Sequence, residues 1–564
     1  MTLRRASAAL LLLAALSGCT GGDDDGPAAP GVMTPSAPVT VDGNGVTVTV
    51  EPGPNSVLTA VVQVTTDEPT RPRLVATADG HRVVVPARGR PARDHTMALV
   101  GLRAETTYDL RLRGDRALAG LDGELAFSTG SLPADLPRVE TQVDGDPRPG
   151  VTLFNATPSD LSVEHPGNLI GVDEEGEVVW YHQDEQLISD ARQLPGGDLL
   201  YNFGNIGARE VDVLGEVVHD WTTSTRVRAG QQDRFGHETY AADAIVIDTP
   251  RLQHEVAFPL PNGNFLALSQ EVRTYRGFED PGCPPGPFED PTVRPQRGDV
   301  VIEYTPDGEV VHQLSLLDAI DPRDQPGSQQ CNLKTDAIAT GDQVFVDWSH
   351  GNSATLFEAE NTVLVSARNL SSVMALRWEA DEHGPAGEVL WQLGPGLDFE
   401  LTEGEWFYRQ HAPEVQPDGT ILLYDNGSQR PVDTDDKAEA PAPYSRAVAY
   451  ELDRSGPRST WTARQVWEHR IDTPAGPVYA DFLGDADSIG GGHVLITHGA
   501  VIDEAVNRNT ALIVEVDRAT DEILLSIRVP SDGDLGWQTY RAEHLDSWYP
   551  RVADQPLAGD PPLP

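Results

Sequence analysis

Lysine is almost absent from this chain, which has only Lys334 and Lys437 among its 564 residues. Lysine and arginine together number 41, against 88 aspartates and glutamates, and the formal net charge is −47. Such a surface repels nucleic acids and anionic membranes, which argues against a DNA- or RNA-binding role. It also repels small anions at long range, so a site for them needs hydrogen-bond donors and an arginine at close quarters.

Cysteine is also scarce, with Cys19, Cys283 and Cys331 the only three in the sequence. None of them lies in a Cys-x-x-Cys spacing, so the sequence contains no zinc or thiol redox motif of that type. In an oxidising compartment Cys283 and Cys331 either form a disulfide or remain two free thiols, and the sequence leaves both alternatives open.

Beyond the N-terminus, no apolar run is long enough to span a membrane. The first residues carry Arg4 and Arg5 and then a short apolar stretch at 6–16, which is typical of an export signal. "LSGC" at 16–19 resembles the bacterial lipobox, which implies that Cys19 is lipidated and that a lipid anchors an exported protein. The alternative is ordinary secretion with cleavage nearby. Both predict a periplasmic or cell-surface location, with residues 1–18 as signal peptide and 19–40 as a flexible linker.

Glycine (53) and proline (45) are abundant, which favours many turns and an all-β fold. Short alternating strands at 41–132 predict a small β-sandwich. Within it, "LVGLRAETTYDLRL" resembles a late-strand signature of fibronectin type III-like modules, with Leu102 and Tyr108 as core residues. Residues 551–564 are expected to form a tail.

A strand–turn–strand pattern recurs six times between 136 and 550, as in "GVDEEGEVVWYH" (171–182) and "EVDVLGEVVHDW" (210–221). A second apolar strand after a turn lies upstream of each copy, as in "LPGGDLLYNF" and "PDGTILLYD". Six paired motifs predict a six-bladed β-propeller, because each pair supplies one four-stranded blade. We expect the strand after the upstream turn to be the innermost strand of its blade.

Three histidines, His254, His350 and His411, each precede a polar or glycine-containing turn and an apolar strand, and Arg368 ends the second of these strands. Asp190 and Asp485 hold the comparable place in two other repeats. A ring of repeats brings equivalent positions to one axis. Imidazoles and a guanidinium gathered there suit an oxyanion that undergoes group transfer. Thr497 and its neighbour His498 are further candidates to line the channel.

Four stretches are similar to the bacterial arylsulfate sulfotransferase family and occur in the same order: "HEVAFPLPNGN", "DWSHGNSA…VLVSARN", "RQHAPEVQPDGTILLYDNGSQR" and "YRAEHLDSWYP". Members have a β-sandwich followed by a six-bladed propeller, and they transfer a sulfuryl group between phenols without phosphoadenosine phosphosulfate. The resemblance implies that His411 is the nucleophile, that His254, His350 and Arg368 hold the sulfuryl oxygens, and that Asn352 lies near them. The closely spaced cysteine pair of some members is missing.

The expected partners are therefore a small aryl sulfate donor and a phenol acceptor, with no cofactor, no metal and no nucleic acid; the sequence does not indicate an oligomeric state. Aromatic residues near the motifs are candidates to stack on an aryl ring. They are Trp348, Trp406, Phe407 and Tyr408. The histidines that end blade strands are more simply structural. They are His182, His219, His312 and His469.

Three alternatives remain. Three histidines suit zinc or copper, although a neighbouring arginine would repel a metal ion. The "DGEVVW" type of repeat also occurs in quinone-dependent dehydrogenases, but no carboxylate cluster of the calcium-binding type accompanies it here. A non-catalytic binding propeller at the cell surface is the third.

Overall fold

The fold is nearly all-β in the computed structural model, which contains two short α-helices, α1 (Ser224–Ala229) and α2 (Leu316–Ala319), among the residues it describes. These residues are 33–43, 45–114, 118, 125–204, 206–233, 235–253, 255, 257–278, 288, 290, 292–327, 333–336, 341–431, 441–503, 506–533 and 535–550. Cys19, Cys283, Cys331 and His254 lie outside them, as do the expected signal peptide and tail. In this part of the chain no helix combines the length and the apolar character that a membrane span needs.

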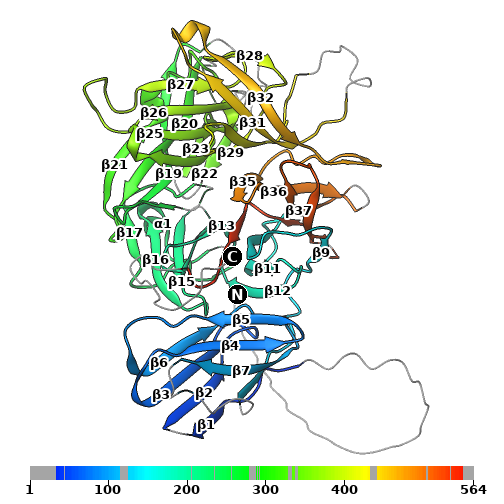
Figure 1. Cartoon of the computed structure of the whole chain (residues 1–564). Helices are drawn as coiled ribbons and strands as arrows, with labels where there is room; N and C mark the ends of the chain where they lie inside the picture. Colours follow the sequence, from blue (N-terminus) through cyan, green and yellow to red (C-terminus); the bar gives the residue numbers. More distant parts are fainter. Residues whose placement is uncertain are drawn as a thin grey trace, which may run out of the picture.

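Two four-stranded sheets form the N-terminal β-sandwich (Figure 1, blue). One contains, in spatial order, β1 (Val39–Gly43), β2 (Val46–Pro52), β3 (Ala60–Thr70) and β6 (Ala92–Leu99). The other contains β5 (His81–Val85), β4 (Arg73–Ala78), β7 (Thr107–Arg113) and β8 (Leu125–Ser128). Buried and exposed residues alternate along β2 and β7, because successive side chains of a strand point to opposite faces. Leu102 and Tyr108 are both fully buried in this core, as predicted.

Six further sheets follow along the chain. The first contains β10 (Val151–Pro158), β11 (Gly167–Asp173), β12 (Val178–Asp184), β39 (Trp537–Gln538) and β40 (Ala542–Leu545). The second contains β13 (Ile188–Gln193), β14 (Leu199–Phe203), β15 (Gly207–Val211), β16 (Val217–Thr223) and β17 (Ile245–Ile247). The third contains β18 (Phe258–Pro259), β19 (Phe265–Arg276), β20 (Val293–Tyr304), β21 (Val310–Ser315), β22 (Leu333–Asp336) and β23 (Gly341–Asp347).

The fourth sheet contains β24 (Gly351–Phe357), β25 (Thr362–Ala367), β26 (Ser372–Arg377) and β27 (Val389–Leu393). The fifth contains β28 (Glu400–Glu403), β29 (His411–Val415), β30 (Ile421–Asp425), β31 (Arg446–Asp453) and β32 (Thr462–His469). The sixth contains β35 (Asp485–Gly490), β36 (His493–Asp503), β37 (Arg508–Asp517), β38 (Ile523–Val529) and the earlier β9 (Glu140–Val143). A hairpin of β33 (Asp472–Thr473) and β34 (Gly476–Pro477) lies between the fifth and sixth sheets in the sequence.

The recurring Asp-x-x-Gly-Glu segment forms the tight turn of a hairpin. Asp173 accepts hydrogen bonds through Oδ1 from the backbone N–H groups of Glu175 and Glu177, and Asp212 does the same for Leu214 and Glu216. The glycine of each turn has a positive φ, 85° at Gly176 and 79° at Gly215. An aspartate that caps the turn and a glycine in the left-handed region explain why this pattern marks a hairpin in the sequence.

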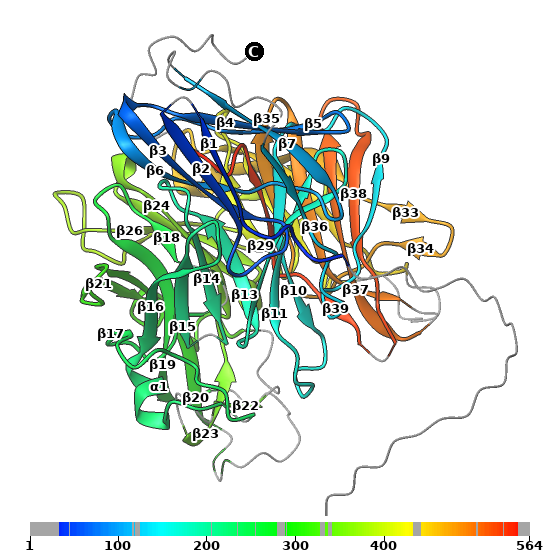
Figure 2. The same cartoon turned by 90° about the horizontal axis from the view of Figure 1, so that it is seen from below.

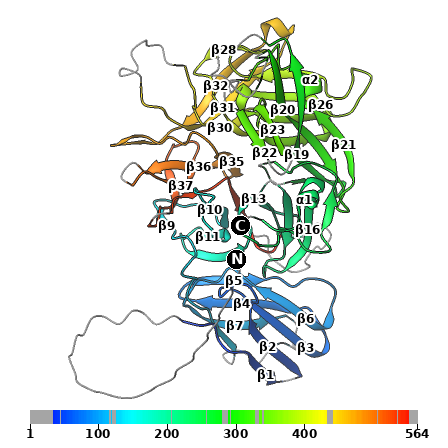
Figure 3. The same cartoon turned by 180° about the vertical axis from the view of Figure 1, so that it is seen from behind.

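Six hydrophobic cores join the six sheets in a circular order. Five lie between consecutive sheets, and the sixth contains Phe154 and Ile170 of the first sheet together with Leu495 and Ile513 of the last. Figures 1 and 3 show the sheets following one another in sequence colour around the middle of this region. Strands from the two ends of the region also pair with each other: β39 and β40, near the C-terminus, pair with β10 of the first sheet, and the early strand β9 pairs with β38 of the last sheet.

The sandwich contacts the first of these sheets through polar bonds. Arg103 lies between Asp173 and Glu175, with its Nη2 2.6 Å from a carboxylate oxygen of each. Tyr549 donates a hydrogen bond of 2.8 Å to the carbonyl of Ala98 in the sandwich. Figure 2 shows the sandwich strands in front of the six-sheet region.

The expected identity of the innermost strands is wrong. The strands after the upstream turns are β14, β25, β30 and β36, and each of them has a strand on both sides in its sheet. The strand before each one forms the edge instead, and these edge strands approach one another, since β24 contacts β29 and β29 contacts β35. The reason is that the segment before the turn, which carries the histidine, is itself extended and pairs with the strand that follows.

Candidate active site

Polar residues from the edge strands of different sheets meet at Arg541, which directly precedes β40. Its Nη1 is 2.6 Å from Oε1 of Glu255 and 3.9 Å from a carboxylate oxygen of Asp190, and its Nε is 3.8 Å from Asp485. Its Nη2 donates a 2.6 Å hydrogen bond to the carbonyl of Asn352. Burial alone would lower the pKa of Arg541, but these carboxylates raise it well above its ordinary value. Arg541 is therefore a fixed cation where four sheets meet.

His411, the first residue of β29, is buried with 2 % of its surface exposed. Its Nδ1 lies 2.6 Å from Oδ1 of Asn426. The amide nitrogen of Asn426 donates 2.8 Å hydrogen bonds to the carbonyls of Ala480 and Leu483, so Oδ1 must be the atom that faces the imidazole. An amide oxygen only accepts, so Nδ1 of His411 carries the proton and Nε2 keeps its lone pair.

The surroundings of His411 favour a neutral ring. Burial is the main cause that lowers its pKa well below the ordinary value, and the positive charges of Arg368, Arg541 and His350 lower it further, against the raising effect of the bond to Asn426. A neutral imidazole with a bare Nε2 is a nucleophile, whereas the protonated ring has no lone pair to offer.

A cavity of about 320 Å³ opens beside this histidine. Its lining consists of Lys334, Asp347, His350, Arg368, Asn369, Arg409, Ser428, Gln429, Tyr479 and Asp481. Two predicted residues, His350 and Arg368, are therefore in its wall, while His411 is not among the lining residues. The segment 480–483 links the two places, because it accepts hydrogen bonds both from Asn426 and, at the carbonyl of Asp481, from Arg368 (2.8 Å).

His350 is held by Asp347. Its Nδ1 lies 2.6 Å from Oδ2 of Asp347, whose Oδ1 is 2.6 Å from Nη2 of Arg297. Although burial raises the pKa of the Asp347 carboxyl, His350 and Arg297 hold it far below the ordinary value, so it stays ionised. The carboxylate fixes the orientation of the imidazole in the cavity wall.

Arg368 has an unsatisfied donor. Its Nε is buried and has no hydrogen-bond acceptor among the described residues. Buried donors without a partner are rare in proteins, and an oxyanion in the cavity would supply the missing acceptor. Lys334, Arg368 and Arg409 supply positive charge to the wall, and the negative charge of Asp347 is already matched by Arg297. Only Asp481 opposes them, so the cavity is electropositive in a strongly acidic protein.

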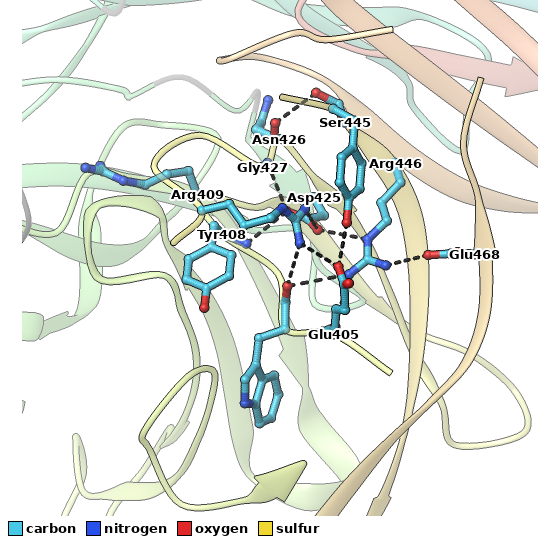
Figure 4. Close-up of polar contacts among 12 residues, drawn as sticks. Glu405, Tyr408, Arg409, Asp425, Asn426, Gly427, Ser445, Arg446 and Glu468 are labelled. Carbon is cyan, nitrogen blue, oxygen red and sulfur yellow. Dashed lines mark hydrogen bonds and ion pairs between the residues drawn. The ribbon is translucent and has the colours of Figure 1, made fainter. Parts of the chain in front are cut away.

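A buried ion-pair network supports the loop on the other side of His411. Asp425, at the end of β30, accepts hydrogen bonds from the backbone N–H of Tyr408 and Gly427 (both 2.9 Å), and it pairs with Arg430 and Arg446 (Figure 4). The network fixes the segments that carry Tyr408 and Asn426. The geometry between His411 and Asn426 is therefore held from two sides.

The remaining predicted residues fall in different places. Asn352 lies beside the site, where its amide nitrogen donates to the carbonyl of Gln410 (2.8 Å) and its Oδ1 is buried without a partner among the described residues. Thr497 is fully buried in β36, a second strand, and does not line the cavity. His254 is not described, although its neighbour Glu255 reaches Arg541. Trp348 and Phe407 are fully buried in the cores between sheets, so neither faces the cavity.

Several functional candidates were not found in the sequence. They are Asp347, Arg409, Asn426, Tyr479 and Arg541. Two of them had a visible signal, since Asn426 lies in "YDNGSQR" and Arg541 in "YRAEHL", within segments that carry the family resemblance. Their side-chain roles depend on contacts between distant segments, such as the 54 positions between Asn426 and Ala480.

A buried neutral imidazole beside an electropositive cavity defines a site for transfer of an anionic group. The family model described as Arylsulfotransferase (ASST) matches residues 137–541, and the chain belongs to this family. Membership indicates a sulfotransferase whose substrates are small aryl sulfates and phenols.

Solved structures are only distantly similar. A protein of unknown function from Bacteroides caccae has 12% identity and a TM-score of 0.35, over 70% of this chain and 98% of its own. The periplasmic gluconolactonase PpgL of Pseudomonas aeruginosa has 13% identity and a TM-score of 0.31, over 69% of this chain and 99% of its own. No curated protein matches the sequence. Among the described residues, no group of three or more histidine, cysteine, aspartate or glutamate side chains is placed to hold a metal ion.

Inorganic sulfate should stabilise the protein through Arg368. At a concentration 100-fold above its dissociation constant, a ligand adds about 2.7 kcal/mol to the free energy of unfolding. Sulfate also stabilises folded proteins in general, and this effect acts on every variant alike. We therefore expect sulfate, compared with chloride of equal ionic strength, to raise the thermal unfolding temperature more for wild type than for Arg368→Gln.

Arg464→Gln is the matched control, because Arg464 pairs with Glu451 on the exposed surface of β32. It should keep the full response to sulfate. An equal response of wild type and Arg368→Gln would mean that Arg368 binds no sulfate.

Proposed function

We propose that this protein transfers a sulfuryl group from an aryl sulfate to a phenol through a covalent intermediate on His411, in a ping-pong sequence. The observation that carries the proposal is the hydrogen bond from Nδ1 of His411 to Oδ1 of Asn426, which leaves Nε2 unprotonated inside a positively charged site. The family assignment supports the substrate class.

In the first step, Nε2 of His411 attacks the sulfur of the donor. An N–S bond forms, the S–O bond to the ring breaks, and the phenolate leaves with the electron pair of that bond. The proton on Nδ1 stays in place, so the intermediate is a sulfated imidazolium whose positive charge Asn426 stabilises through its carbonyl dipole. His350, which lines the cavity and is oriented by Asp347, protonates the departing phenolate.

In the second step, a phenol replaces the first product. His350, now neutral, accepts the hydroxyl proton of this phenol, and the phenol oxygen attacks the sulfur. The N–S bond then breaks, and its electrons return to Nε2. Charge on the three sulfuryl oxygens spreads during both transfers, as in phosphoryl transfer, and Arg368 donates to them. His254, from the resemblance, is the second imidazole ligand, and Asn352 supports the pocket. Substrate binding by Thr497 stays a prediction.

The scaffold in this proposal is a six-bladed β-propeller that follows a fibronectin type III-like sandwich. The circular order of the six inter-sheet cores supports it, and so do the strand pairs that link β10 with β40 and β9 with β38. Export and lipid anchoring through Cys19 belong to the same proposal, on the basis of the N-terminal "LSGC". Cys283 and Cys331, in an oxidising compartment, would be free to pair.

The direct test combines the protein with 4-nitrophenyl sulfate and phenol. We expect nitrophenol release that depends on phenol, and a single sulfuryl adduct on the peptide that contains His411 when the donor is added alone. His411→Ala should show neither, since it lacks the nucleophile. His469→Ala, at a buried histidine of β32, is the control and should keep both. An adduct on a different residue would disprove the role of His411.

Asn426→Ala should slow the first step about fivefold, because one hydrogen bond of about 1 kcal/mol no longer selects the tautomer with Nε2 bare. The donor concentration that gives half-maximal rate should change little. Asn168→Ala is the matched control. Asn168 is a buried asparagine whose amide nitrogen also donates to two carbonyls, of Ala156 and Pro166, but it contacts no histidine. If both variants slow the adduct formation equally, the effect is structural.

The pH dependence should reflect the lowered pKa of His411. An ordinary histidine with a pKa of about 6.5 would lose roughly tenfold in neutral form between pH 7.5 and 5.5. Because burial and Arg368 lower the pKa of His411, its neutral form should persist to lower pH than that of an ordinary histidine, and its attack on the donor should slow clearly less than tenfold over that range. The measurement is rapid-mixing release of nitrophenol read at its isosbestic wavelength. A tenfold loss centred near pH 6.5 would contradict the assignment.

A further inference from the structure

Arg409 is a buried cation without a matching carboxylate. Only 1 % of its surface is exposed, and its guanidinium donates to two neutral amide oxygens, Oδ1 of Asn369 and Oε1 of Gln429 (2.6 Å). No carboxylate among the described residues lies within ion-pair distance of it. Burial and the charge of Arg368 lower the pKa of Arg409 to about 10, so it remains positive at neutral pH.

Three other buried arginines of these sheets are paired with carboxylates. Arg297 has Asp347, Arg446 has Asp425 and Arg541 has Glu255, each with nitrogen and oxygen 2.6–3.0 Å apart. A buried charge is costly unless an opposite charge accompanies it. An anion in the cavity, which Arg409 lines, would supply the negative charge that this guanidinium lacks.

Arg409 and Arg368 share one acceptor. Oδ1 of Asn369 accepts from Arg409 and also from Nη1 of Arg368 at 3.3 Å, so the two guanidinium groups lie on either side of a single amide oxygen. Two cations this close repel each other, and both line the cavity. One sulfuryl group carries a single negative charge in the donor ester, which leaves the second cation unmatched.

The two arginines differ in their relation to His411. The charges that lower the pKa of His411 most are those of Arg368, Arg541 and His350. Arg409, two residues before His411, extends away from Asp425 in Figure 4, and its Nη2 donates to Oε1 of Gln429. Arg368 is thus placed for the group being transferred, and Arg409 for another part of the substrate.

The backbone is strained where Arg409 and its partner are held. Arg409 has φ 59° and Gln429 has φ 61°, both in the left-handed region that costs a residue with a side chain of its own about 1 kcal/mol or more. Such strain persists where the surrounding structure enforces a particular side-chain position. Here the enforced position keeps a guanidinium and an amide together in the cavity wall.

We propose that Arg409, together with Gln429 and Lys334 in the same wall, forms a second anion subsite that binds an acidic substituent, a carboxylate or a second sulfate, on the aromatic ring of the substrate. The inference rests on the proposed sulfotransferase function and specifies its substrates as phenols and aryl sulfates that carry such a group. Lys334 is exposed and adds charge at the entrance, while the amide nitrogen of Gln429 is a further donor. In a ping-pong sequence the departing and the incoming phenol use the same subsite in turn.

The test uses 4-nitrophenyl sulfate as donor and compares two pairs of acceptors, 3- and 4-hydroxybenzoate and their methyl esters. The measured quantity is the ratio of kcat/KM for the acid to kcat/KM for its ester. Intrinsic differences in phenol reactivity cancel when this ratio is compared between variants. For at least one isomer, Arg409→Gln should lower the ratio about 10- to 100-fold, as expected for loss of a charge-assisted hydrogen bond.

A second variant preserves the buried arginine. Gln429→Glu changes an amide to a carboxylate of the same shape and gives Arg409 an internal counter-ion, so it should lower the ratio in the same direction. Arg226→Gln is the matched control, because Arg226 is also buried and bonded to Thr239 and to the carbonyl of Gln232, but lies by α1, outside the cavity lining. It should leave the ratio unchanged.

The outcomes separate the two proposals. If wild type releases nitrophenol with the esters and the acids, and neither Arg409→Gln nor Gln429→Glu changes the ratio, the second subsite is wrong while the sulfotransferase function stands. If wild type transfers sulfuryl to none of the four acceptors nor to phenol, both fail. A ratio that falls in both variants and not in Arg226→Gln establishes the subsite.

Discussion

The buried guanidinium of Arg541 is the constraint on which the centre of the molecule depends. It holds Asp190, Asp485 and the backbone of Asn352, which come from three different sheets, and Glu255, which precedes β18 of another. Removing one partner of such a buried cluster typically costs about 3–5 kcal/mol, because the groups left behind stay buried and unpaired. Apolar packing between the sheets is non-directional, whereas hydrogen bonds and ion pairs are directional. The bonds to Arg541 therefore fix the position of each edge strand relative to the others. The position of His411 relative to Arg368 depends on this arrangement of the edge strands.

The protein as a whole is strongly negative, whereas the wall of the cavity is positive. The whole chain carries a formal charge of −47, yet the cavity wall combines Lys334, Arg368 and Arg409 against one uncompensated acid. Long-range repulsion slows the approach of anions, and short-range donors then bind them in a site with little water, where each interaction is stronger. Selectivity in such a protein comes from the contacts inside the cavity, and attraction from a distance contributes nothing to it.

Much of the architecture was readable from the sequence, and much of the site was not. The Asp-x-x-Gly-Glu turns predict hairpins because their chemistry is local, and the burial of Leu102 and Tyr108 follows from the resemblance to a fibronectin type III-like signature. His350 and Arg368 were found through the repeat, and the structure brings them into one cavity. The innermost strands were misassigned, because an extended segment before a turn shows no alternation to mark it. Asn426 and Arg409 escaped notice, since an asparagine in a turn and an arginine beside a histidine gain meaning only from partners such as Ala480 and Asn369.

The order of the site along the chain has a consequence for biosynthesis. Tyr540 and Arg541 lie between the closing strands β39 and β40, which pair with β10 almost 390 positions earlier, and Tyr540 lies edge-on to the ring of His411 with centroids 6.3 Å apart. A nascent chain that still lacks this segment has the carboxylates of Asp190, Glu255 and Asp485 but not the guanidinium that gathers them. The centre of the six sheets is therefore complete only when the last strands pair with the first.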